Sequence, residues 1–321
     1  HFHLTNLGKQ LDTLQLKKIK SSKDIVELIL KKSKNIGDDE WLLGFGWDQN
    51  KWNQPIFPKS DILDSLPISQ PILLTRIDGH AAWVNKKALQ LSGIDIMHSS
   101  IEGGDIINNC ILIDNAMNPV KKIIPEPDEN MVEKWIKLAL EIIISKGITN
   151  IHDAWQDPIT VKVLKNLVNS DNLPIRIYGM LGSSYPKLLK QFFKAGIFQK
   201  GNYTIRSVKA FIDGALGSRG AALFEPYRDD HNNCGLILIS HDEFNQISKK
   251  CLDAGYQLCT HAIGDRGNKM VLDIYTTFVR NIKNHRWRIE HAQMVRNEDV
   301  PKFYQSGIIP SMQPSHCTSD M

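Results

Sequence analysis

The sequence lacks the features that mark several protein classes. Its five cysteines include no pair at CxxC spacing, so we expect no disulfide framework and favour a reducing compartment, the cytoplasm. No apolar run reaches the roughly eighteen residues that a membrane span needs, so no membrane partner is expected. Basic residues number 39 and acidic residues 35, and no basic block alternates with aromatics. We therefore expect no nucleic-acid partner either.

The 321 residues that are present suit one barrel-sized domain with an insertion. Hydrophobic residues make up 42% and charged residues 23%, which is an ordinary globular balance. The chain starts at His1 without a methionine and stops at Met321 after an apparent strand. We interpret both ends as cuts in a longer protein, and a secretory leader that had been removed would leave the same start.

Short β-rich runs alternate with helical runs from Gly147 onward. This rhythm implies parallel βαβ units, and its regular spacing suits a closed (β/α)8 TIM-like barrel better than an open sheet, although periodicity leaves closure open. In such barrels the chemistry gathers at the C-terminal ends of the strands. We expect strands at 147–153, 174–181, 203–213, 256–262, 287–291 and 308–313, and helices at 158–169, 186–195, 241–254, 265–281 and 297–305.

A stretch of about ninety residues breaks this rhythm. It contains an expected strand at Pro71–Arg76, a helix at Asn85–Leu91 that Gly93 would end, and a hairpin turn at Glu102–Asp105. We expect a small α/β lobe over the barrel mouth. Its tryptophans, Trp47, Trp52 and Trp83, are more typical of a core than of a pocket. The expected domains are the start of the barrel at 1–39, the inserted lobe at 40–127, and barrel strands 2 to 7 at 128–321.

Four histidines occupy positions that favour a metal site. His1 and His3 are two apart, so in a strand both face the same way and can hold one ion. An HxH pair alone is weak evidence, because a tag remnant gives the same pattern. His261 and His291 each end a predicted strand, and one helix separates the two strands. Either one alone would read as a strand-end histidine with a backbone partner, but matched positions favour convergence on a metal.

Lys209 lies within an apolar predicted strand. Burying an ammonium group is costly unless it is paired or chemically altered. One interpretation is that the stem is buried and the ammonium group reaches solvent. The other is carboxylation by carbon dioxide, which makes an anionic carbamate that can bridge two divalent cations.

Taken together, these motifs resemble the amidohydrolase superfamily. They are the HxH start, "VKAFIDGALGSR" around Lys209, "THAIGDR" and "RIEHAQ". The most similar branch is the amidohydrolase-3 group, which includes YtcJ-like proteins and N-substituted formamide deformylases. The segments GWDQNKW and RIDGHAAWVNKKAL resemble that group's inserted lobe, and SMQPSH resembles its seventh strand. The resemblance covers nearly the whole chain, and the motifs are specific only as a set.

The resemblance implies roles for matching positions. His1 and His3 would bind one divalent metal ion, His261 and His291 the other, and carboxylated Lys209 would bridge them together with a hydroxide. Lys209, His261 and His291 would thus be catalytic. The implied activity is hydrolysis of carbon–nitrogen bonds in small non-peptide amides by a metal-activated hydroxide, with zinc as the first expectation.

The chain departs from the family at its end. The family places a catalytic aspartate after the eighth strand, whereas we expect this chain to end after its seventh, without that aspartate and without the family's terminal β-sandwich. Asp320 is not assigned the role.

Other polar residues are weaker candidates. His80, Arg219 and His316 are candidate substrate-binding residues, as is Gln313, with a structural role at least as well supported for each. His152–Asp153 ends the second strand, where a supporting position is favoured over direct ligation. The segment GALGSRG lacks the GK[ST] ending of a phosphate loop.

Three rival interpretations stay open. The same two-metal site can hydrolyse esters, lactones or phosphoesters. A mononuclear deaminase would not need a carboxylated lysine. The barrel can also be a non-catalytic binding protein. A homodimer is a further expectation, because an open barrel edge invites pairing.

Overall fold

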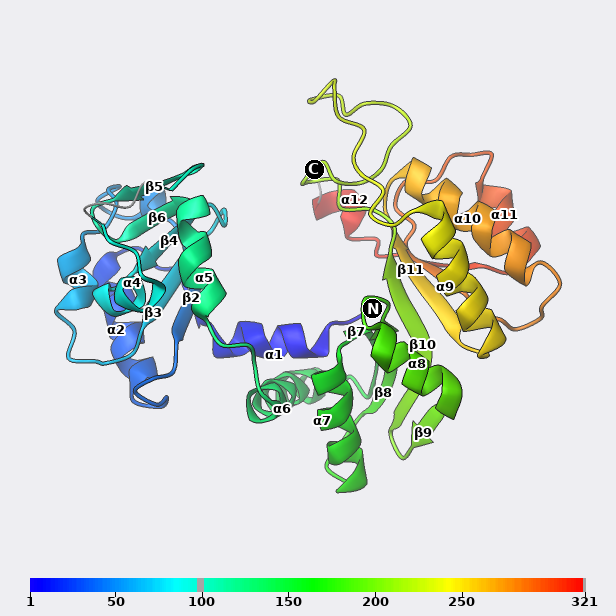
Figure 1. Ribbon diagram of the computed structural model, residues 1–321, viewed down its shortest axis with the longest axis horizontal. Helices are drawn as coiled ribbons and strands as arrows, with labels where there is room; N and C mark the ends of the chain where they lie inside the picture. Colours follow the sequence, from blue (N-terminus) through cyan, green and yellow to red (C-terminus); the bar gives the residue numbers. More distant parts are fainter. Residues whose placement is uncertain (97–100, 320–321) are drawn as a thin grey trace. The chain divides into compact units, whose positions relative to one another are not determined.

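The computed structural model describes residues 1–96 and 101–319, and these form two compact units. The barrel unit consists of His1–Leu4 and Leu140–Met321, and the lobe unit of Thr5–Ala139. Two helices cross the boundaries between them, α1 (Leu4–Asp12) and α6 (Glu129–Ser145). Figure 1 shows both helices within the continuous path of the chain.

A parallel sheet forms the centre of the barrel unit. Its strands follow the order β13-β12-β11-β10-β8-β7, while the short β9 pairs antiparallel with β10. The strands are β7 (Asn150–Gln156), β8 (Arg176–Gly182), β9 (Phe198–Lys200), β10 (Tyr203–Phe211), β11 (Gln257–Ala262), β12 (Arg288–His291) and β13 (Ile309–Ser311). The helices are α7 (Pro158–Asn169), α8 (Pro186–Ala195), α9 (His241–Asp253), α10 (Asp265–Val279), α11 (Val300–Ser306) and α12 (His316–Ser319).

Spatial order in this sheet follows sequence order, as expected for successive βαβ units. Phe2 forms a parallel bridge with Asp153 and thus adds the chain start beside β7. The sheet is strongly curled, because His1 at this edge contacts Glu290 of β12 at 3.0 Å. The result is a partial TIM-like barrel.

The local sequence sets several helix ends as predicted. Asp157 caps α7 by accepting from Thr160 N, and Pro158 occupies the first turn. Ser240 and Glu243 form a capping box at the start of α9. Gly147 differs from its predicted place in a strand. It has a φ of 72° and donates to Ile144 O, so it ends α6, and β7 starts three residues later than expected.

The lobe unit contains a mixed sheet in the order β1-β2-β3-β4-β6-β5. Its strands are β1 (Leu14–Gln15), β2 (Leu42–Trp47), β3 (Ile72–Arg76), β4 (Ala81–Val84), β5 (Gly104–Ile107) and β6 (Ile111–Asp114). Its helices are α2 (Ser22–Ser33), α3 (Ser60–Asp64), α4 (Lys86–Ser92) and α5 (Asn118–Ile123), with 3-10 turns at Gln49–Lys51 and Asn115–Met117.

This unit is wider than the expected lobe at 40–127. The strand β1 pairs with β2, and Ile25 and Ile29 of α2 enter the same apolar core as Trp47 and Trp83. Residues 5–39 therefore pack with the lobe, whereas the sequence rhythm had placed them at the start of the barrel. The position of the lobe over the barrel mouth stays a prediction.

The hairpin turn lies five residues beyond its predicted place. Gly104 and Asp105 belong to β5, and the chain reverses at Asn108 and Asn109, whose φ values are 50° and 58°. Two adjacent residues with positive φ match the tight turn that joins twisted antiparallel strands, and asparagine tolerates this conformation well. Gly93 ends α4 in the left-handed conformation, as predicted.

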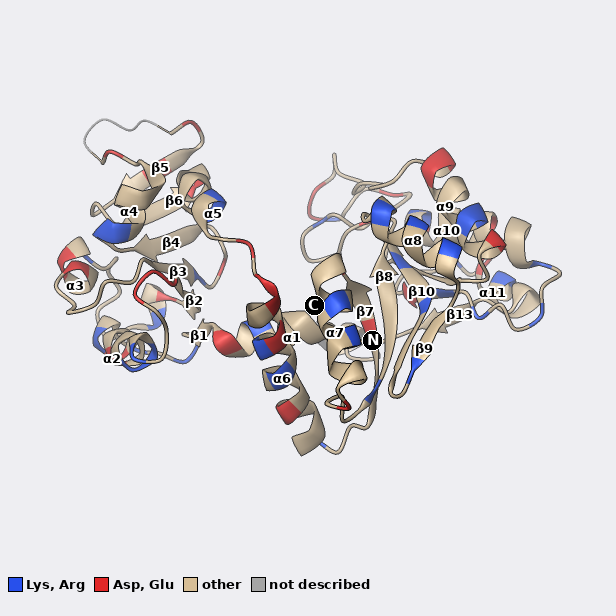
Figure 2. Cartoon of the chain, turned by 60° about the horizontal axis from the view of Figure 1, so that its bottom comes forward, with Lys and Arg blue, Asp and Glu red and all other residues tan. Residues whose placement is uncertain are grey.

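Charged residues of both signs occur on the elements of each unit (Figure 2). None of the helices in the described part combines the length and the apolar composition that crossing a bilayer requires.

Candidate metal centre

The strand register builds the centre in layers. Lys209 of β10 pairs with Cys259 of β11, which pairs with Arg288 of β12. Two residues further on, Phe211 pairs with His261, and His261 with Glu290. Side chains two apart on a strand share a face, so both layers point into the barrel. Cys259 lies in the deeper layer and is a buried core residue.

His291 needs a special backbone to reach this face. It pairs with Ala262, so regular pleating would turn its side chain away from His261. His291 and Ala292 instead have φ values of 74° and 44°. A left-handed backbone is costly for a non-glycine residue and is concentrated at functional sites. Here it accompanies an imidazole whose ring centroid lies 4.7 Å from that of His261.

The four predicted histidines come together at the C-terminal ends of the strands. The Nε2 atoms of His1 and His3 are 3.3 Å apart, and the His1 ring centroid lies 4.8 Å from that of His291. Distances of this size allow several rings to contact the same small ion. The convergence predicted from four separated histidines is therefore present in the structure.

Lys209 lies below the histidines with its side chain buried. Its Nζ atom has no hydrogen-bond partner and sits 4.0 Å from the centroid of the Phe211 ring. Burial lowers the pKa of this amine to about 8, although the Glu290 carboxylate opposes the shift. Of the two interpretations of Lys209, the structure contradicts the one in which its ammonium group reaches solvent.

Burial also lowers the pKa of three of these histidines. Desolvation is the largest cause that lowers the pKa of His3 and of His261, each to about 4, and it lowers the pKa of His291 as well. A neutral imidazole is the form that binds a metal, because its nitrogen lone pair is free.

A buried carboxylate, Glu290, supports the centre and escaped the sequence analysis. It accepts from His1 Nδ1 at 3.0 Å and forms an ion pair with Arg288 at 2.5 Å. Arg288 also contacts His152 Nδ1 at 2.9 Å, which gives His152 the supporting position expected for it. The available signal was the charged pair in the strand RIEH, since a central strand buries charge only when it is paired.

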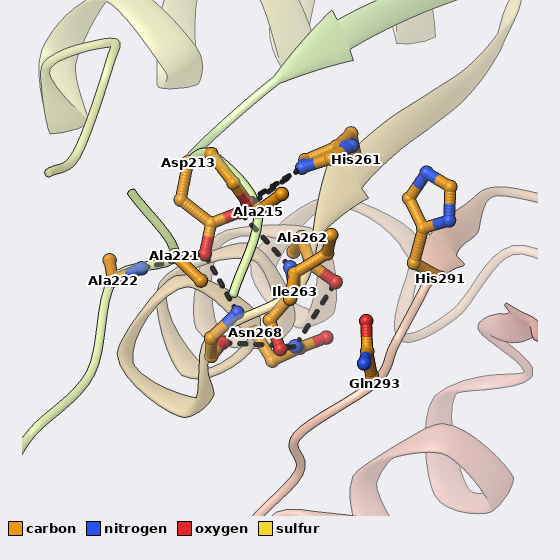
Figure 3. A network of polar contacts seen from close by, with 12 residues as sticks. Asp213, Ala215, Ala221, Ala222, His261, Ala262, Ile263, Asn268, His291 and Gln293 are labelled. Atoms are coloured by element: carbon orange, nitrogen blue, oxygen red, sulfur yellow. Dashed lines mark hydrogen bonds and ion pairs between the residues drawn. The ribbon is translucent and has the colours of Figure 1, made fainter. Parts of the chain in front are cut away.

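Asp213 and Asn268 tie three strand ends together (Figure 3). The Asp213 carboxylate accepts from the backbone N–H groups of Ala222, Ile263 and Gly264, and lies 3.5 Å from His261 Nε2. The Asn268 amide donates to the carbonyls of Ala262, Ile263, Gly264 and Met294. These bonds fix the chain directly after His261 and after His291. Both residues were missed, because such contacts have no sequence period.

The candidate substrate-binding residues differ in whether they contact the histidine cluster. His316 stacks on His291 at 5.5 Å, and the Gln313 side-chain oxygen accepts from His291 Nδ1 at 2.7 Å. Arg219 is exposed and pairs with Asp229. His80 belongs to the lobe unit and pairs with Asp114. Asp320 lies outside the described residues.

The residues fit a metal through a donor set that includes lysine. Across residues 1–96 and 101–319, no group of three His, Cys, Asp or Glu side chains is by itself arranged to hold an ion. The centre instead combines imidazoles with the buried, unpartnered amine of Lys209. As an ammonium group Lys209 would repel a cation, whereas a carbamate on the same nitrogen would supply the missing anionic oxygens.

The fold and the site define a class, namely a partial β/α barrel with a histidine and lysine cluster at the C-terminal ends of its strands. A profile of the Amidohydrolase family matches residues 1–320, and the chain belongs to that family.

Known relatives agree with this membership. The chain is 28% identical to the protein LONG AFTER FAR-RED 3 of Arabidopsis thaliana over 341 residues, covering 100% of this chain and 58% of the relative. It is 21% identical to the N-substituted formamide deformylase of Arthrobacter pascens, covering 89% of this chain and 55% of that enzyme. The crystal structure of an uncharacterized metal-dependent hydrolase from Pyrococcus furiosus superposes with a TM-score of 0.79 at 28% identity, covering 100% of this chain and 64% of that one. The chain thus spans under two thirds of these relatives.

Proposed function

We propose that the protein is a metal-dependent hydrolase that cleaves carbon–nitrogen bonds in small non-peptide amides. The observation that carries the proposal is the convergence of four imidazoles beside the buried, unpartnered amine of Lys209. Family membership and the similarity to metal-dependent hydrolases support a hydrolase of this type. The related formamide deformylase supports the choice of a carbon–nitrogen bond.

His1, His3, His261, His291 and carboxylated Lys209 would hold one or two divalent ions, with zinc as our first choice. Such ions, when bound, polarise a carbonyl group and make water nucleophilic at neutral pH. The carboxylation of Lys209 is part of the proposal, and its lowered pKa supports it, because only the neutral amine adds to carbon dioxide.

Hydrogen bonds at the far side of three rings select the nitrogen that each offers to an ion. His1 Nδ1 faces Glu290, which leaves Nε2 for the centre. His261 Nε2 faces the carbonyl of Gly214, which leaves Nδ1. His291 Nδ1 faces Gln313, which leaves Nε2. Partners of this kind fix both the tautomer and the ring orientation of metal-binding histidines. His316 and Arg219 remain our candidates for contacts with substrate, and the cytoplasm remains our proposed compartment.

The direct test is to measure metal content and hydrolysis in the same preparations. The purified chain is loaded with Zn²⁺ in bicarbonate, and its metal content is compared with that of Lys209→Ala and of Lys190→Ala, a matched exposed lysine. We expect the parent and Lys190→Ala to retain one or two ions per chain. We expect Lys209→Ala to lose at least one ion, because a side chain that would hold the ions is gone. Intact mass at neutral pH should exceed the mass after acidification by one carbon dioxide.

Substrate panels then separate the rival activities. Matched amide, ester, lactone and phosphoester substrates are offered to the loaded chain, with the amides expected to turn over fastest. Preference for esters, lactones or phosphoesters would keep the metal centre and reject the carbon–nitrogen assignment. Equal metal content in Lys209→Ala and the parent would reject the centre itself.

A further inference from the structure

A cavity of about 860 Å³ lies between helices α8 and α9 of the barrel unit. Each helix contributes a stripe with the spacing i, i+3, i+4 and i+7, which is one face of a helix. The stripe of α8 consists of Pro186, Leu189, Lys190 and Phe193, and that of α9 of Glu243, Gln246, Ile247 and Lys250. Each stripe covers seven steps of a helix, so the cavity is about 10 Å long.

The neighbouring helix pair shows that such a gap is not general in this fold. Helices α9 and α10 pack directly, with the Phe244 and Tyr275 rings stacked at 5.8 Å. Figure 1 shows α8, α9 and α10 along the same sheet. The space between α8 and α9 therefore needs an explanation that ordinary helix packing does not give.

The cavity adjoins the metal centre through one aromatic ring. Phe211 lines the cavity, and the same ring lies 5.1 Å from the ring of His261 and 4.0 Å from Lys209 Nζ. Trp155 extends this wall, with its ring 5.3 Å from that of Phe211. A side-chain carbon at Gly182 would lie 2.8 Å from Trp155, so glycine leaves the room in which the indole sits.

The lining selects an apolar occupant. Aromatic and aliphatic side chains supply most of its lining, with Leu238 and Ile239 contributed by the segment before α9. The uncharged polar or acidic members are Ser183, Ser184, Glu243 and Gln246. The exposed lysines Lys190 and Lys250 border it with their alkyl stems, as lysine often does at apolar surfaces. Its volume and its lining match those of pockets that bind small ligands.

We infer that this cavity binds an alkyl or aryl arm of the substrate, while the scissile amide lies on the far side of Phe211 at the histidine cluster. The inference rests on the proposed function and narrows it to amides that carry a large apolar substituent. A small amide without such an arm would leave the cavity unused.

The test uses linear alcohols from 1-butanol to 1-octanol as neutral probes, titrated into the chain by calorimetry. Burying one methylene group is worth about a fourfold gain in affinity, so we expect a steep chain-length series. The variant Ile247→Trp fills the cavity and should lower 1-octanol affinity at least about tenfold, because several methylenes lose their place. Lys249→Trp adds the same ring to an exposed position on α9 outside the cavity lining, and should leave the affinity unchanged.

A second variant covers the case in which Ile247→Trp does not fold. Leu238 is exposed in a loop, so Leu238→Gln should fold and flatten the chain-length series. A flat series in the parent overturns the inference, as does an equal loss in Ile247→Trp and Lys249→Trp. If sedimentation shows that Ile247→Trp dissociates a dimer while its octanol affinity is unchanged, the cavity is a contact between two copies of the chain, and the inference is overturned.

The two proposals fail separately. If the parent chain retains metal but the alcohol affinities do not rise with chain length, the substrate-arm inference is wrong and the proposed hydrolase stands. A steep series without metal retention removes the proposed hydrolase, and the amide assignment of the cavity falls with it.

Discussion

The two units of the chain bury different kinds of polar groups. In the barrel unit the buried polar side chains include Asp153, Lys209, Asp213, Arg288 and Glu290, all of them ionisable. Among the described residues of the lobe unit they are Gln49, Gln70 and Asn85, which carry no charge. The lobe core itself is built around large apolar rings such as Trp47 and Trp83.

The buried ionisable groups of the barrel unit lower its stability, and they are concentrated around the candidate site. Buried charge costs several kcal/mol unless it is paired, and a well-packed apolar core costs nothing comparable. Lys209 is buried without any hydrogen-bond partner, and the Phe211 ring and the Glu290 carboxylate offset only part of the cost of its burial. The barrel unit therefore holds the candidate site, and the lobe unit is stabilised by ordinary packing.

The largest effect on stability is expected from the lobe core. Trp83 is fully buried, so Trp83→Ala should lower the unfolding free energy of this unit by about 3–5 kcal/mol through the cavity it leaves. Amide hydrogen exchange should rise in β3 and β4, with β7 to β12 as the internal reference. Trp83→Phe is the milder control. If the variant lost its metal while the barrel amides stayed protected, the separation of roles between the units would be wrong.

The next largest effect on stability is expected at Asp213, a buried carboxylate of the barrel unit. Asp213→Ala leaves three buried N–H groups without an acceptor, which should cost about 3–4 kcal/mol in denaturant unfolding. Asp213→Asn keeps one carbonyl oxygen and should recover part of that loss. Because the network fixes the chain after His261, zinc affinity should fall in the same order. Equal zinc affinity in all three proteins would show that the carboxylate serves folding alone.

The sequence predicted the clustering of the candidate ligands better than the residues that support them. The members of the cluster are marked by strand-end position or by family motifs; they are His1, His3, Lys209, His261 and His291. Their role as metal ligands stays a prediction. Glu290, Asp213 and Asn268 were not found, because their partners lie far away in sequence and obey no period. The backbone of His291 was equally hidden, since no residue pattern announces a positive φ at a histidine.

The ends of helices and strands were also predicted correctly where local signals define them and wrongly where distant pairing defines them. Helices α7 and α8 match their predicted ranges, because a proline and the apolar spacing define them locally. The hairpin at Asn108–Asn109 was misplaced, because the EGGD segment offered an equally good turn signal and only pairing across β5 and β6 decides between them. The reach of the lobe to Thr5 likewise depends on the pairing of β1 with β2.

An effect of opposite sign is expected at Lys209. Its pKa falls from 10.5 in the unfolded chain to about 8 in the metal-free fold. At about 1.4 kcal/mol per pKa unit, Lys209→Met should stabilise the metal-free protein at neutral pH by about 3 kcal/mol, while abolishing metal retention. The unfolded chain binds more protons between these two pKa values, so parental stability should rise with pH there.

Denaturant unfolding of both proteins at several pH values checks this. The advantage of Lys209→Met should be complete below pH 8 and shrink towards pH 10.5. Lys250→Met, an exposed lysine on α9, is the control and should change little at any pH. A parent that is more stable than Lys209→Met without metal would mean that the amine is paired, and the contrast between the two cores would lose its main support.

The smallest effect tests whether ordinary local rules hold equally in both units. Ser240 caps α9 through its hydroxyl and through the reciprocal contact with Glu243, so Ser240→Ala should cost about 1 kcal/mol. Ser92 near the end of α4 offers the matched change in the lobe unit. Its hydroxyl only donates back to Leu89 O, and Ser92→Ala should therefore cost less than about 0.5 kcal/mol. Denaturant unfolding measures both. Since neither serine touches a buried charge, zinc content should stay constant in both variants; a loss of zinc in Ser240→Ala would mean that the start of α9 also positions the centre.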